Sequence, residues 1–269
     1  MSEDHLVPPD VVARLRAAGC VFAEDEAQLL FEAATTPGEL MAMVEERVGG
    51  TPLEHLLGWV EFAGMRIGVD RGVFVPRRRT EVLVREAVTL TGDGAVVVEL
   101  CCGVAAVSVA IAAMTQAAEV VAADVDPAAV RCARANLMDF GGRVYEGDLY
   151  DPLPEALQGR VDVIVANAPY VPTDAIAMMP PEARDYEPHV SLDGGPDGVA
   201  LHRRIADSAG VWLAPGGHLL IETSRHQTEL TTDAFVRAGL TARVVRADDV
   251  DGTAVVGSVA GEAAEPSVK

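Results

Sequence analysis

Four consecutive residues, Asn167-Ala168-Pro169-Tyr170, could hold a planar –NH2 group. They follow an apolar run at 161–166 that has the composition of a buried strand. The side-chain oxygen of Asn167 and the carbonyl of Ala168 could each accept one N–H, and the Tyr170 ring could stack on the π face. Pro169 would fix the turn and bias Ala168 towards extended backbone. We interpret the four residues as a site that orients a nitrogen nucleophile; a turn with a capping Asn and a core Tyr is the alternative.

A second group of residues has the position of a nucleotide-binding loop. Residues 99–105 read E-L-C-C-G-V-A and would join a strand to the next helix. Gly103 is the only glycine, but Cys101 and Ala105 are small enough to allow fairly close backbone approach. About 20 residues further on, Asp124 ends the next predicted strand, where a carboxylate can accept both hydroxyls of a ribose. The pattern indicates a nucleoside-type cofactor, with a purely structural βα turn as the alternative.

The elements that must position these residues alternate between strand and helix from about residue 80 onwards. We predict short apolar strands at 95–100, 119–124, 143–146, 161–166 and 218–222, with helices such as 106–114 and 127–138 between them. This alternation is typical of a mostly parallel sheet covered on both faces. Ligands of such folds bind beyond the carboxyl ends of the strands. The predicted strand ends carry polar side chains, namely Glu99, Asp124, Asp148, Asn167 and Glu222.

The first part of the chain has a different pattern. Residues 1–57 predict helices that begin near Pro8, Ala23 and Pro37, and the run G-G-T-P at 49–52 ends the pattern. The segments 59–62 and 65–69 alternate around Ala63-Gly64 and predict a β-hairpin, with Trp59 and Phe62 in its core. We therefore expect a helical domain at 1–57, a hairpin linker at 58–79, an α/β domain at 80–258 and a flexible tail at 259–269.

Composition excludes several functional classes. The chain has 269 residues, 49% of them apolar, and a formal net charge of −20, so its surface should repel phosphate backbones and we expect no nucleic-acid partner. It contains no apolar run long enough to span a membrane, and residues 1–5 lack the layout of a signal peptide, so we expect a cytoplasmic protein. The four cysteines lack paired C-x-x-C spacing, and we expect reduced thiols and no metal site.

Several motifs, in order along the chain, resemble the HemK/PrmC family of protein-(glutamine-N5) methyltransferases. They are T-P-L-E-H-L-L-G at 51–58, E-F-A-G at 61–64, V-P-R-R-R-T-E at 75–81, N-A-P-Y at 167–170 and L-D-G-G-P-D-G at 192–198. The similarity covers about residues 25–258. The chain departs from the family patterns N-P-P-Y and D/E-x-G-x-G-x-G, because Ala168 replaces a proline and Cys101 and Ala105 replace glycines.

The resemblance implies a class I fold dependent on S-adenosylmethionine (SAM): a Rossmann-like α/β domain with a mostly parallel seven-stranded sheet, a small helical N-terminal domain and a hairpin linker. It implies SAM as cofactor, S-adenosylhomocysteine as product, and methylation of the G-G-Q glutamine of a peptide-chain release factor or of another glutamine-bearing protein. The catalytic residues would be Asn167, Ala168, Pro169 and Tyr170. The cofactor-binding residues would be Glu99, Leu100, Cys101, Cys102, Gly103, Ala105, Asp124, Val125, Asp148, Leu149, Asn167, Arg77 and Thr80.

Three other functions remain open at this stage. The same fold could methylate an amino or amide nitrogen of a small metabolite. It could methylate adenine or cytosine in nucleic acid, although that activity normally requires a basic track on the surface. It could also be a non-catalytic binding module descended from the enzyme, as the loss of two loop glycines would suggest. A test of SAM binding would distinguish the non-catalytic binding module from the methyltransferase functions.

Overall fold

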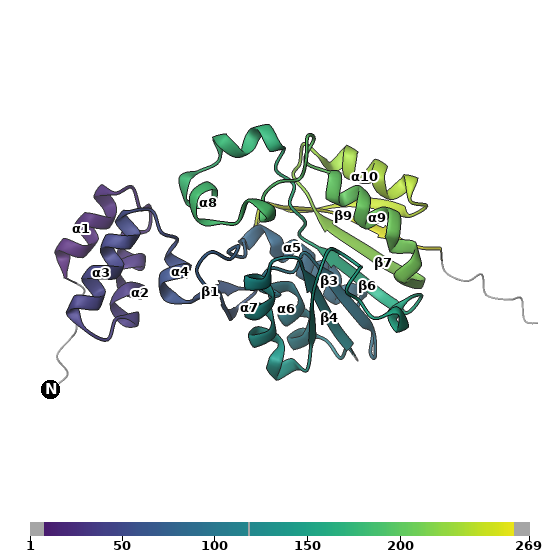
Figure 1. Cartoon of the computed structure of the whole chain (residues 1–269), viewed down its shortest axis with the longest axis horizontal. Helices are drawn as coiled ribbons and strands as arrows, with labels where there is room; N and C mark the ends of the chain where they lie inside the picture. Colours follow the sequence, from purple (N-terminus) through teal and green to yellow (C-terminus); the bar gives the residue numbers. More distant parts are fainter. Residues whose placement is uncertain (1–7, 118, 261–269) are drawn as a thin grey trace, which may run out of the picture.

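Residues 8–117 and 119–260 are described by the structure, a computed structural model, and they form a helical bundle connected through a hairpin to a layered α/β domain (Figure 1). The bundle contains α1 (Pro9–Ala17), α2 (Ala23–Ala33) and α3 (Pro37–Val48), and α4 (Leu53–Leu57) leads out of it. The hairpin strands are β1 (Trp59–Phe62) and β2 (Met65–Gly68). Residues 261–269 of the predicted tail lie outside the described residues.

The α/β domain alternates strands with helices, as the apolar pattern predicts. Its first half contains η1 (Arg78–Thr80), α5 (Glu81–Leu90), β3 (Val96–Leu100), α6 (Ala106–Met114), β4 (Glu119–Asp124), α7 (Pro127–Leu137), η2 (Met138–Phe140), β5 (Arg143–Glu146) and η3 (Glu155–Leu157). The second half contains β6 (Val161–Ala166), η4 (Thr173–Met178), α8 (Pro181–Tyr186), η5 (His189–Ser191), α9 (Ala200–Trp212), β7 (Leu213–Glu222), α10 (Thr228–Arg237), β8 (Thr241–Ala247) and β9 (Gly252–Ser258).

The seven strands are ordered β5-β4-β3-β6-β7-β9-β8. The five strands from β5 to β7 are parallel, and β9 pairs antiparallel with both β7 and β8. The expectation of a mostly parallel seven-stranded sheet is therefore confirmed. Two details differ from the sequence-based expectation: β7 begins at Leu213 rather than near residue 218, and β8 and β9 complete the edge beyond it.

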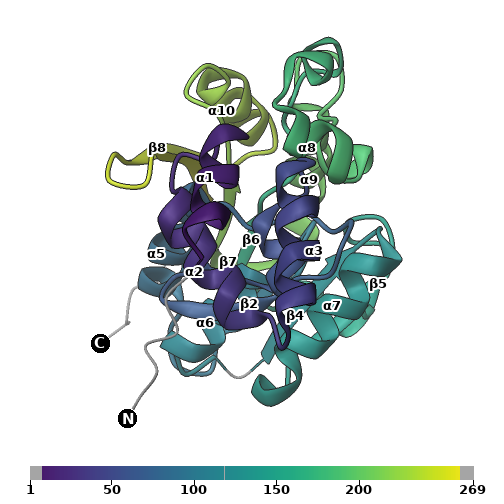
Figure 2. The ribbon, with the colours of Figure 1, turned by 90° about the vertical axis from the view of Figure 1, so that its left-hand side faces the viewer.

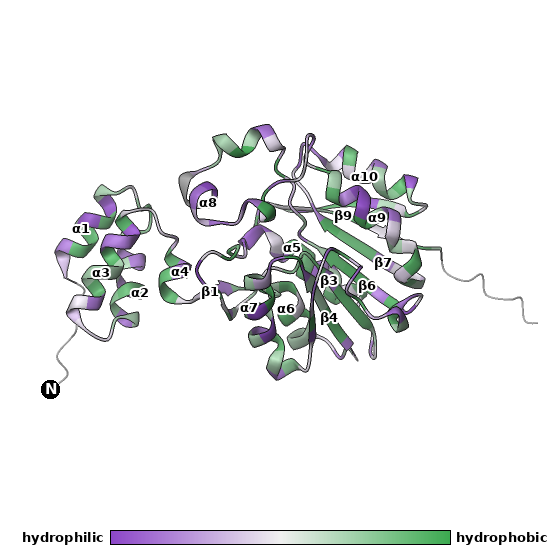
Figure 3. Cartoon of the chain, viewed as in Figure 1, coloured by the Kyte–Doolittle hydropathy of each residue, from purple (hydrophilic) through white to green (hydrophobic). Residues whose placement is uncertain are grey.

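Each central strand contributes to two hydrophobic cores, one on each face of the sheet. In β3, Val97 packs in the core formed with α5, α6 and α7, whereas Val96 and Val98 pack in the core formed with α9 and α10. Figure 3 shows the central strands as hydrophobic over most of their length. Strands covered on both faces need this nearly continuous apolar composition, and the rigid sheet that results fixes the loops at its carboxyl edge.

The hairpin packs on the α/β domain instead of standing free. Its buried residues Phe62 and Ile67 belong to the same core as α5–α7. Asn136 of α7 accepts a hydrogen bond from the backbone N–H of Gly68 at 3.0 Å and donates one to its carbonyl at 2.9 Å. Trp59, expected in the hairpin core, is only half-buried, and the Arg66 guanidinium lies over its ring at 4.1 Å.

The helical bundle has its own small core. In the view of Figure 2, α1, α2 and α3 lie together on the side of the molecule that faces the viewer. Val11, Leu15, Leu30 and Val44 are among its buried residues. Arg47 of α3 pairs with Glu26 of α2 at 2.6 Å (Nε to Oε2), and both side chains are largely buried.

Every helix between residues 8 and 117 or 119 and 260 is too short or too polar to span a membrane.

Candidate active site

A cavity of about 720 Å³ opens at the carboxyl ends of the central strands. Its wall includes Gly103 after β3, Asp124 at the end of β4, Asp148 after β5 and Asn167 after β6. Its other side is formed by the junction between hairpin and α5, represented by Phe74, Arg77 and Arg79, and by residues 187–195. The strand ends Asp124, Asp148 and Asn167 therefore meet around one ligand-sized space, whereas Glu99 and Glu222, which the sequence also marks, do not line it.

The loop after β3 keeps the backbone shape of a glycine-rich loop although two of its glycines are replaced. Cys101, Gly103 and Ala105 have φ angles of +51°, +53° and +60°. These are the three glycine positions of the D/E-x-G-x-G-x-G pattern. A left-handed conformation costs a non-glycine residue roughly 1–2 kcal/mol. The fold therefore imposes the loop geometry, and Cys101 and Ala105 adopt it under strain.

Asp124 is held in place before any ligand arrives. Its Oδ2 accepts a hydrogen bond from the Gly103 N–H at 2.7 Å, and its Oδ1 accepts one from the Asp126 N–H at 2.9 Å. Burial raises the pKa of Asp124, and these hydrogen bonds oppose the rise. Each oxygen keeps a lone pair for a further donor, so the carboxylate fits a pair of ribose hydroxyls. Asp126 itself caps α7 by accepting from the Ala128 N–H at 2.8 Å.

The far end of this side of the cavity lies between β4 and β5. Val125 is exposed and lines the cavity together with Leu149, which has a φ of +50°. The Arg204 guanidinium of α9 pairs with Asp148 at 2.7 Å, and both side chains are half-exposed. An ion pair this exposed contributes little free energy. Asp148 can therefore exchange Arg204 for a hydrogen-bond donor of a ligand with little loss of free energy.

Five of the predicted cofactor-binding residues do not line the cavity: Glu99, Leu100, Cys102, Ala105 and Thr80. Glu99 points to the α6 face of the sheet, where its Oε2 accepts from the Ser108 N–H at 2.7 Å. Burial raises its pKa to about 7. Sequence spacing places Glu99, Leu100, Cys102 and Ala105 in the loop motif at 99–105, but the alternation of β3 turns Glu99 away from the ligand space.

The N-A-P-Y turn lines the cavity through Asn167, Ala168, Pro169 and Tyr170. The Asn167 Nδ2 donates to the Thr80 hydroxyl at 3.3 Å. The Tyr170 hydroxyl donates to Glu222 Oε1 at 3.2 Å, and the Arg79 guanidinium lies 6.0 Å from the centre of the Tyr170 ring. With its amide nitrogen engaged, the Asn167 side chain has Oδ1 left as a hydrogen-bond acceptor.

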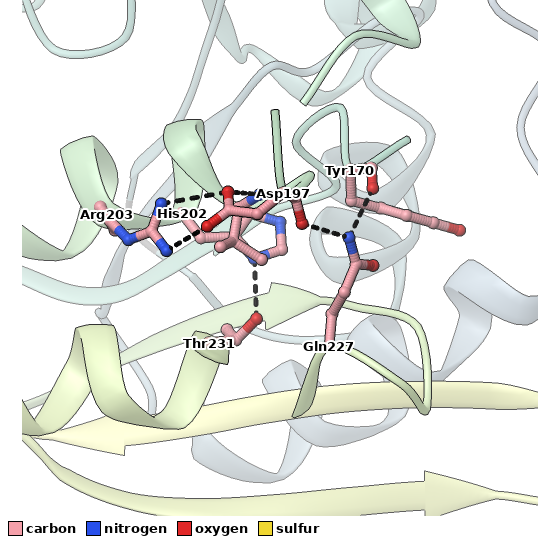
Figure 4. Close-up of polar contacts among 7 residues, drawn as sticks. Tyr170, Asp197, His202, Arg203, Gln227 and Thr231 are labelled. Atoms are coloured by element: carbon pink, nitrogen blue, oxygen red, sulfur yellow. Dashed lines mark hydrogen bonds and ion pairs between the residues drawn. The ribbon is translucent and has the colours of Figure 1, made fainter. Parts of the chain in front are cut away.

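The L-D-G-G-P-D-G motif packs directly behind this turn. Val171 N–H donates to the Leu192 carbonyl at 3.0 Å, and Gly194 N–H donates to the Val171 carbonyl at 2.8 Å. Gln227, just before α10, donates from Nε2 to the carbonyls of Tyr170 at 2.8 Å and Asp197 at 3.1 Å (Figure 4). The sequence offered no signal for Gln227, because its Nε2 contacts are made to backbone carbonyls far away in the chain.

His202 of α9 lies behind the same turn and is fully buried. Its Nδ1 lies 2.9 Å from the Thr231 hydroxyl (Figure 4). Burial lowers its pKa to about 4, although the Ala168 backbone acts in the opposite direction. The ring is therefore neutral near pH 7 and serves as a structural hydrogen-bonding group.

Glu187 connects the segment after Tyr170 to the hairpin side of the cavity. Its carboxylate, only 1% exposed, pairs with the Arg77 guanidinium at 2.5 Å. Burial raises the pKa of Glu187, and Arg77 lowers it by a smaller amount.

No three His, Cys, Asp or Glu side chains converge into a metal site in the part of the chain that the structure describes.

The sheet order and the cavity at its carboxyl edge define a class I methyltransferase fold. A methyltransferase of Pyrococcus furiosus superimposes with a TM-score of 0.55 at 16% identity, covering 82% of this chain and 98% of that one. A complex from E. cuniculi responsible for methylation of a translation termination factor gives a TM-score of 0.50 at 17% identity, covering 71% and 99% of the two chains. At these identities the likeness concerns the fold alone.

Sequence comparison identifies the family. Residues 66–179 match the methyltransferase small domain. The chain is 37% identical to the release factor glutamine methyltransferase of Mycolicibacterium smegmatis, covering 91% of this chain and 88% of the relative, and 37% identical to that of Geobacter sulfurreducens, covering 78% and 74%. It is also 35% identical to a 4-amino-L-phenylalanine/4-methylamino-L-phenylalanine methyltransferase of Streptomyces pristinaespiralis, covering 77% and 73%. The chain belongs to the release factor glutamine methyltransferase family, and its cofactor is SAM.

Proposed function

We propose that this enzyme transfers the methyl group of SAM to the side-chain nitrogen (N5) of the G-G-Q glutamine in a peptide-chain release factor. The observation that carries the proposal is the geometry of Asn167. Its Nδ2 is held by Thr80 while its side chain lines the cavity that also contains Asp124. The same cavity therefore contains Asn167, which could accept a hydrogen bond from an amide, and Asp124, whose carboxylate suits a nucleoside.

The residues around the cavity suggest how SAM would lie. Asp124 would accept the two ribose hydroxyls, and Asp148 with Leu149 would flank the adenine. Cys101, Gly103 and Arg77 would face the methionine end. Five predicted residues would not touch SAM and would instead hold the loop or the residues that line the cavity. They are Leu100, Cys102, Ala105, Glu99 and Thr80. SAM supplies the methyl group on a sulfonium; the chain supplies alignment.

The N-A-P-Y turn would prepare the acceptor. An amide nitrogen is a poor nucleophile, because its lone pair is delocalised into the carbonyl. The Asn167 side-chain oxygen and the Ala168 carbonyl would accept its two N–H groups, and the Tyr170 ring would stack on the amide plane. This arrangement places the nitrogen in line with the methyl group and stabilises the positive charge that develops on it. As the new N–C bond forms the S–C bond breaks, and the nitrogen then releases one proton to water.

The molecule as a whole fits a protein acceptor in the cytoplasm. Residues 1–57 would recognise the acceptor protein, because none of them lines the cavity and yet they precede the hairpin, which leads to the cavity-lining residues Phe74, Arg77 and Arg79. The formal net charge of −20 does not favour a nucleic-acid acceptor.

The test is methyl transfer to a purified release factor that carries G-G-Q. The enzyme is incubated with SAM and the release factor, and the tryptic peptide containing G-G-Q is sequenced by mass spectrometry. We expect one added methyl group on the glutamine. A release factor with that glutamine replaced by alanine is the matched control and should gain none. If the enzyme binds SAM but leaves the G-G-Q glutamine unmodified, the acceptor is a different one.

A second candidate is methylation of an arylamine of a free amino acid. The 35% identity to the 4-amino-L-phenylalanine/4-methylamino-L-phenylalanine methyltransferase favours it. The cavity wall also includes apolar side chains, such as Phe74, Val190 and Leu192, against which an aromatic ring could pack. Incubation with 4-amino-L-phenylalanine and SAM, followed by mass spectrometry of the small molecule, separates the two. Turnover of the arylamine but not of the release factor would select this candidate.

A further inference from the structure

Asn136 of α7 joins the hairpin to the loop after β3. Besides its two hydrogen bonds to the backbone of Gly68, its Nδ2 donates to the carbonyl oxygen of Val104 at 2.9 Å. The amide thereby uses its two N–H donors on two carbonyls and its oxygen on one N–H group. The half-buried Asn136 side chain does not line the cavity, whereas Cys101 and Gly103 of the loop do. Any effect of Asn136 on a ligand must therefore pass through the loop.

The carbonyl that Asn136 holds belongs to the peptide group between Val104 and Ala105. The other end of this peptide group is held as well, because the Ala105 N–H donates to the Cys102 carbonyl at 2.7 Å. Helix α6 does not supply the bond to the Val104 carbonyl, since the Ser108 N–H, four residues on, donates to the buried carboxylate of β3. The orientation of this peptide group therefore depends on Asn136 and on the turn from Cys102 to Ala105.

The orientation of this peptide group determines the backbone conformation of Ala105. Ala105 has a φ of +60°, which is unfavourable for a residue that carries a Cβ. Rotation of the planar Val104–Ala105 peptide by about half a turn would bring Ala105 to a negative φ, because the φ of the following residue changes with the peptide plane. The same rotation would turn the Val104 carbonyl away from Asn136. The hydrogen bond from Asn136 therefore opposes the motion that would relieve the backbone strain.

We propose that Asn136 is a positioning residue for SAM binding, which holds the loop after β3 in the conformation that the family pattern obtains from a glycine at position 105. Glycine reaches a positive φ without steric cost, whereas Ala105 depends on the hydrogen bond from Asn136. The inference rests on the proposed function only for the placement of SAM against Cys101 and Gly103, and the identity of the acceptor does not enter it. Because the same amide also holds Gly68, the docking of the hairpin and the shape of the loop depend on one side chain.

The decisive variant is Asn136→Ala, measured alone and together with Ala105→Gly. In the single variant the loop should leave its left-handed conformation for part of the time, and SAM binds only to the fraction that keeps it. We expect the Kd for SAM, measured by calorimetry, to rise on the order of tenfold, which corresponds to the loss of one hydrogen bond. At saturating SAM we expect kcat to change by less than about threefold, because the bound state restores the loop.

Glycine at position 105 should remove the need for Asn136. In the Ala105→Gly background, Asn136→Ala should weaken SAM binding by less than about threefold, because glycine keeps a positive φ without help. A residue that only supports the fold would cost the same affinity in both backgrounds. An equal loss in both backgrounds would therefore overturn the proposal, and so would an Asn136→Ala variant that binds SAM as tightly as the wild type.

Cys132→Ala is the matched control for the contact with the hairpin. Cys132 lies one turn earlier on α7, and its Sγ donates to the same Gly68 carbonyl at 3.2 Å. This hydrogen bond holds the hairpin and not the loop, so Cys132→Ala should leave the Kd for SAM within about twofold of the wild type. A loss as large as that of Asn136→Ala would show that hairpin docking, and not the Val104 carbonyl, controls SAM affinity.

Amide hydrogen exchange without SAM reports on the loop directly. The Ala105 N–H should exchange faster in Asn136→Ala than in the wild type or in Cys132→Ala, because the turn that protects it opens more often. Equal exchange in the three proteins would overturn the proposal. If thermal unfolding shows that Asn136→Ala does not fold, Asn136→Asp takes its place in every comparison. It keeps the shape and the acceptor for the Gly68 N–H but cannot donate to the Val104 carbonyl.

None of the binding and exchange measurements requires a methyl acceptor, so they remain separate from the test of the proposed function. If the wild type binds SAM and shows these differences but transfers no methyl group to a release factor, only the acceptor assignment fails. If the release factor is methylated while Asn136→Ala binds SAM like the wild type, the role of Asn136 fails alone.

Discussion

The proposed function assigns Asn167 to the acceptor and Asp124 to the cofactor. The Asn167 side-chain nitrogen donates to Thr80, whereas Asp124 accepts hydrogen bonds from the backbone N–H of Gly103 in the loop after β3 and of Asp126 just before α7. Both side chains line the same cavity. Their substitutions should consequently have opposite kinetic signatures.

The first prediction concerns this pair. Asn167→Ala should lower methyl transfer on the order of 10²-fold or more, because an acceptor that orients the nucleophile is lost, while calorimetry should find SAM affinity changed by only a few-fold. Asp124→Ala should weaken SAM binding first, because the buried carboxylate would no longer meet the ribose. Equal loss of SAM binding and transfer in Asn167→Ala would contradict the assigned roles.

Cys101 tests the strained loop. The residue has a φ of +51° at a position where the family pattern has glycine. Cys101→Gly should remove a left-handed strain of about 1 kcal/mol and clear a side chain from the cavity wall. We expect equal or higher stability in urea unfolding and tighter SAM binding by calorimetry. Lower stability together with weaker binding would show that the cysteine side chain contributes packing that outweighs its strain.

Glu99 should make stability depend on pH. Burial raises its pKa from 4.5 to about 7. Between these values the folded state keeps a proton that the unfolded state has lost, so folding stability falls as pH rises through this window and stays low above it. The cost corresponds to about 3 kcal/mol, at 1.36 kcal/mol per pH unit.

The matching measurement compares wild type with Glu99→Gln by urea unfolding at several pH values. The amide oxygen of glutamine can still accept the Ser108 N–H, but no charge has to be buried. The variant should gain stability over wild type as pH rises from 5 to 8, and the two should converge at the acidic end. Parallel curves would mean that Glu99 does not titrate in this range.

At the scale of elements, the acceptor turn depends on a support built from distant segments. The L-D-G-G-P-D-G motif and Gln227 both contact the backbone of Tyr170 and Val171. Gly198 lies where these pieces meet, with a φ of +75°, and a Cβ at this position would collide with Gln227 Nε2 and the Tyr170 carbonyl oxygen. A side chain at 198 is therefore incompatible with the observed turn.

Gly198→Ala should displace the turn while leaving the central sheet folded. We expect methyl transfer to drop on the order of 10²-fold, with SAM affinity much less affected, as measured by steady-state kinetics and calorimetry. Gly210→Ala in α9 is the control, because a Cβ there meets nothing within 4 Å. A Gly198→Ala enzyme as active as the control would refute the supporting role of this contact.

At the scale of the molecule, the helical bundle and the α/β domain have separate cores. The bundle buries Val11, Leu15, Leu30 and Val44 among its own helices, and the cavity wall begins only at Phe74. The hairpin belongs energetically to the α/β domain, because its side chains complete that core. The residues that line the cavity are therefore separate from the core of the bundle.

Removal of residues 1–57 should test this separation. We expect SAM affinity by calorimetry to stay within a few-fold of the full chain, because the cavity wall is intact. The KM for a protein acceptor should rise, whereas a short G-G-Q peptide should be methylated at a similar kcat/KM by both proteins. Far-ultraviolet circular dichroism and thermal unfolding verify the fold. An equal loss with both acceptors would show that the bundle does not recognise the protein.

Much of the fold and part of the site followed from local sequence signals. Apolar runs predicted the five parallel strands, and the residues at their ends predicted where ligands bind, because hydrophobic periodicity and turn residues act over short distances. The left-handed backbone at Cys101 and Ala105, and the direction of the buried Glu99 towards α6, could not be read from side-chain types. They follow from how β3 pairs with its neighbours.

The order of elements, the methyltransferase family and the residues of the N-A-P-Y turn could be read from the amino-acid sequence alone. What holds that turn in place became visible only in the folded chain. Asn167 meets Thr80 across 87 residues of chain, and Tyr170 meets Glu222 across 52. Contacts over such separations depend on the sheet order, which places the ends of β6 and β7 side by side and brings the start of α5 against them. Contacts of this kind follow from that juxtaposition, and no local pattern in the sequence encodes them.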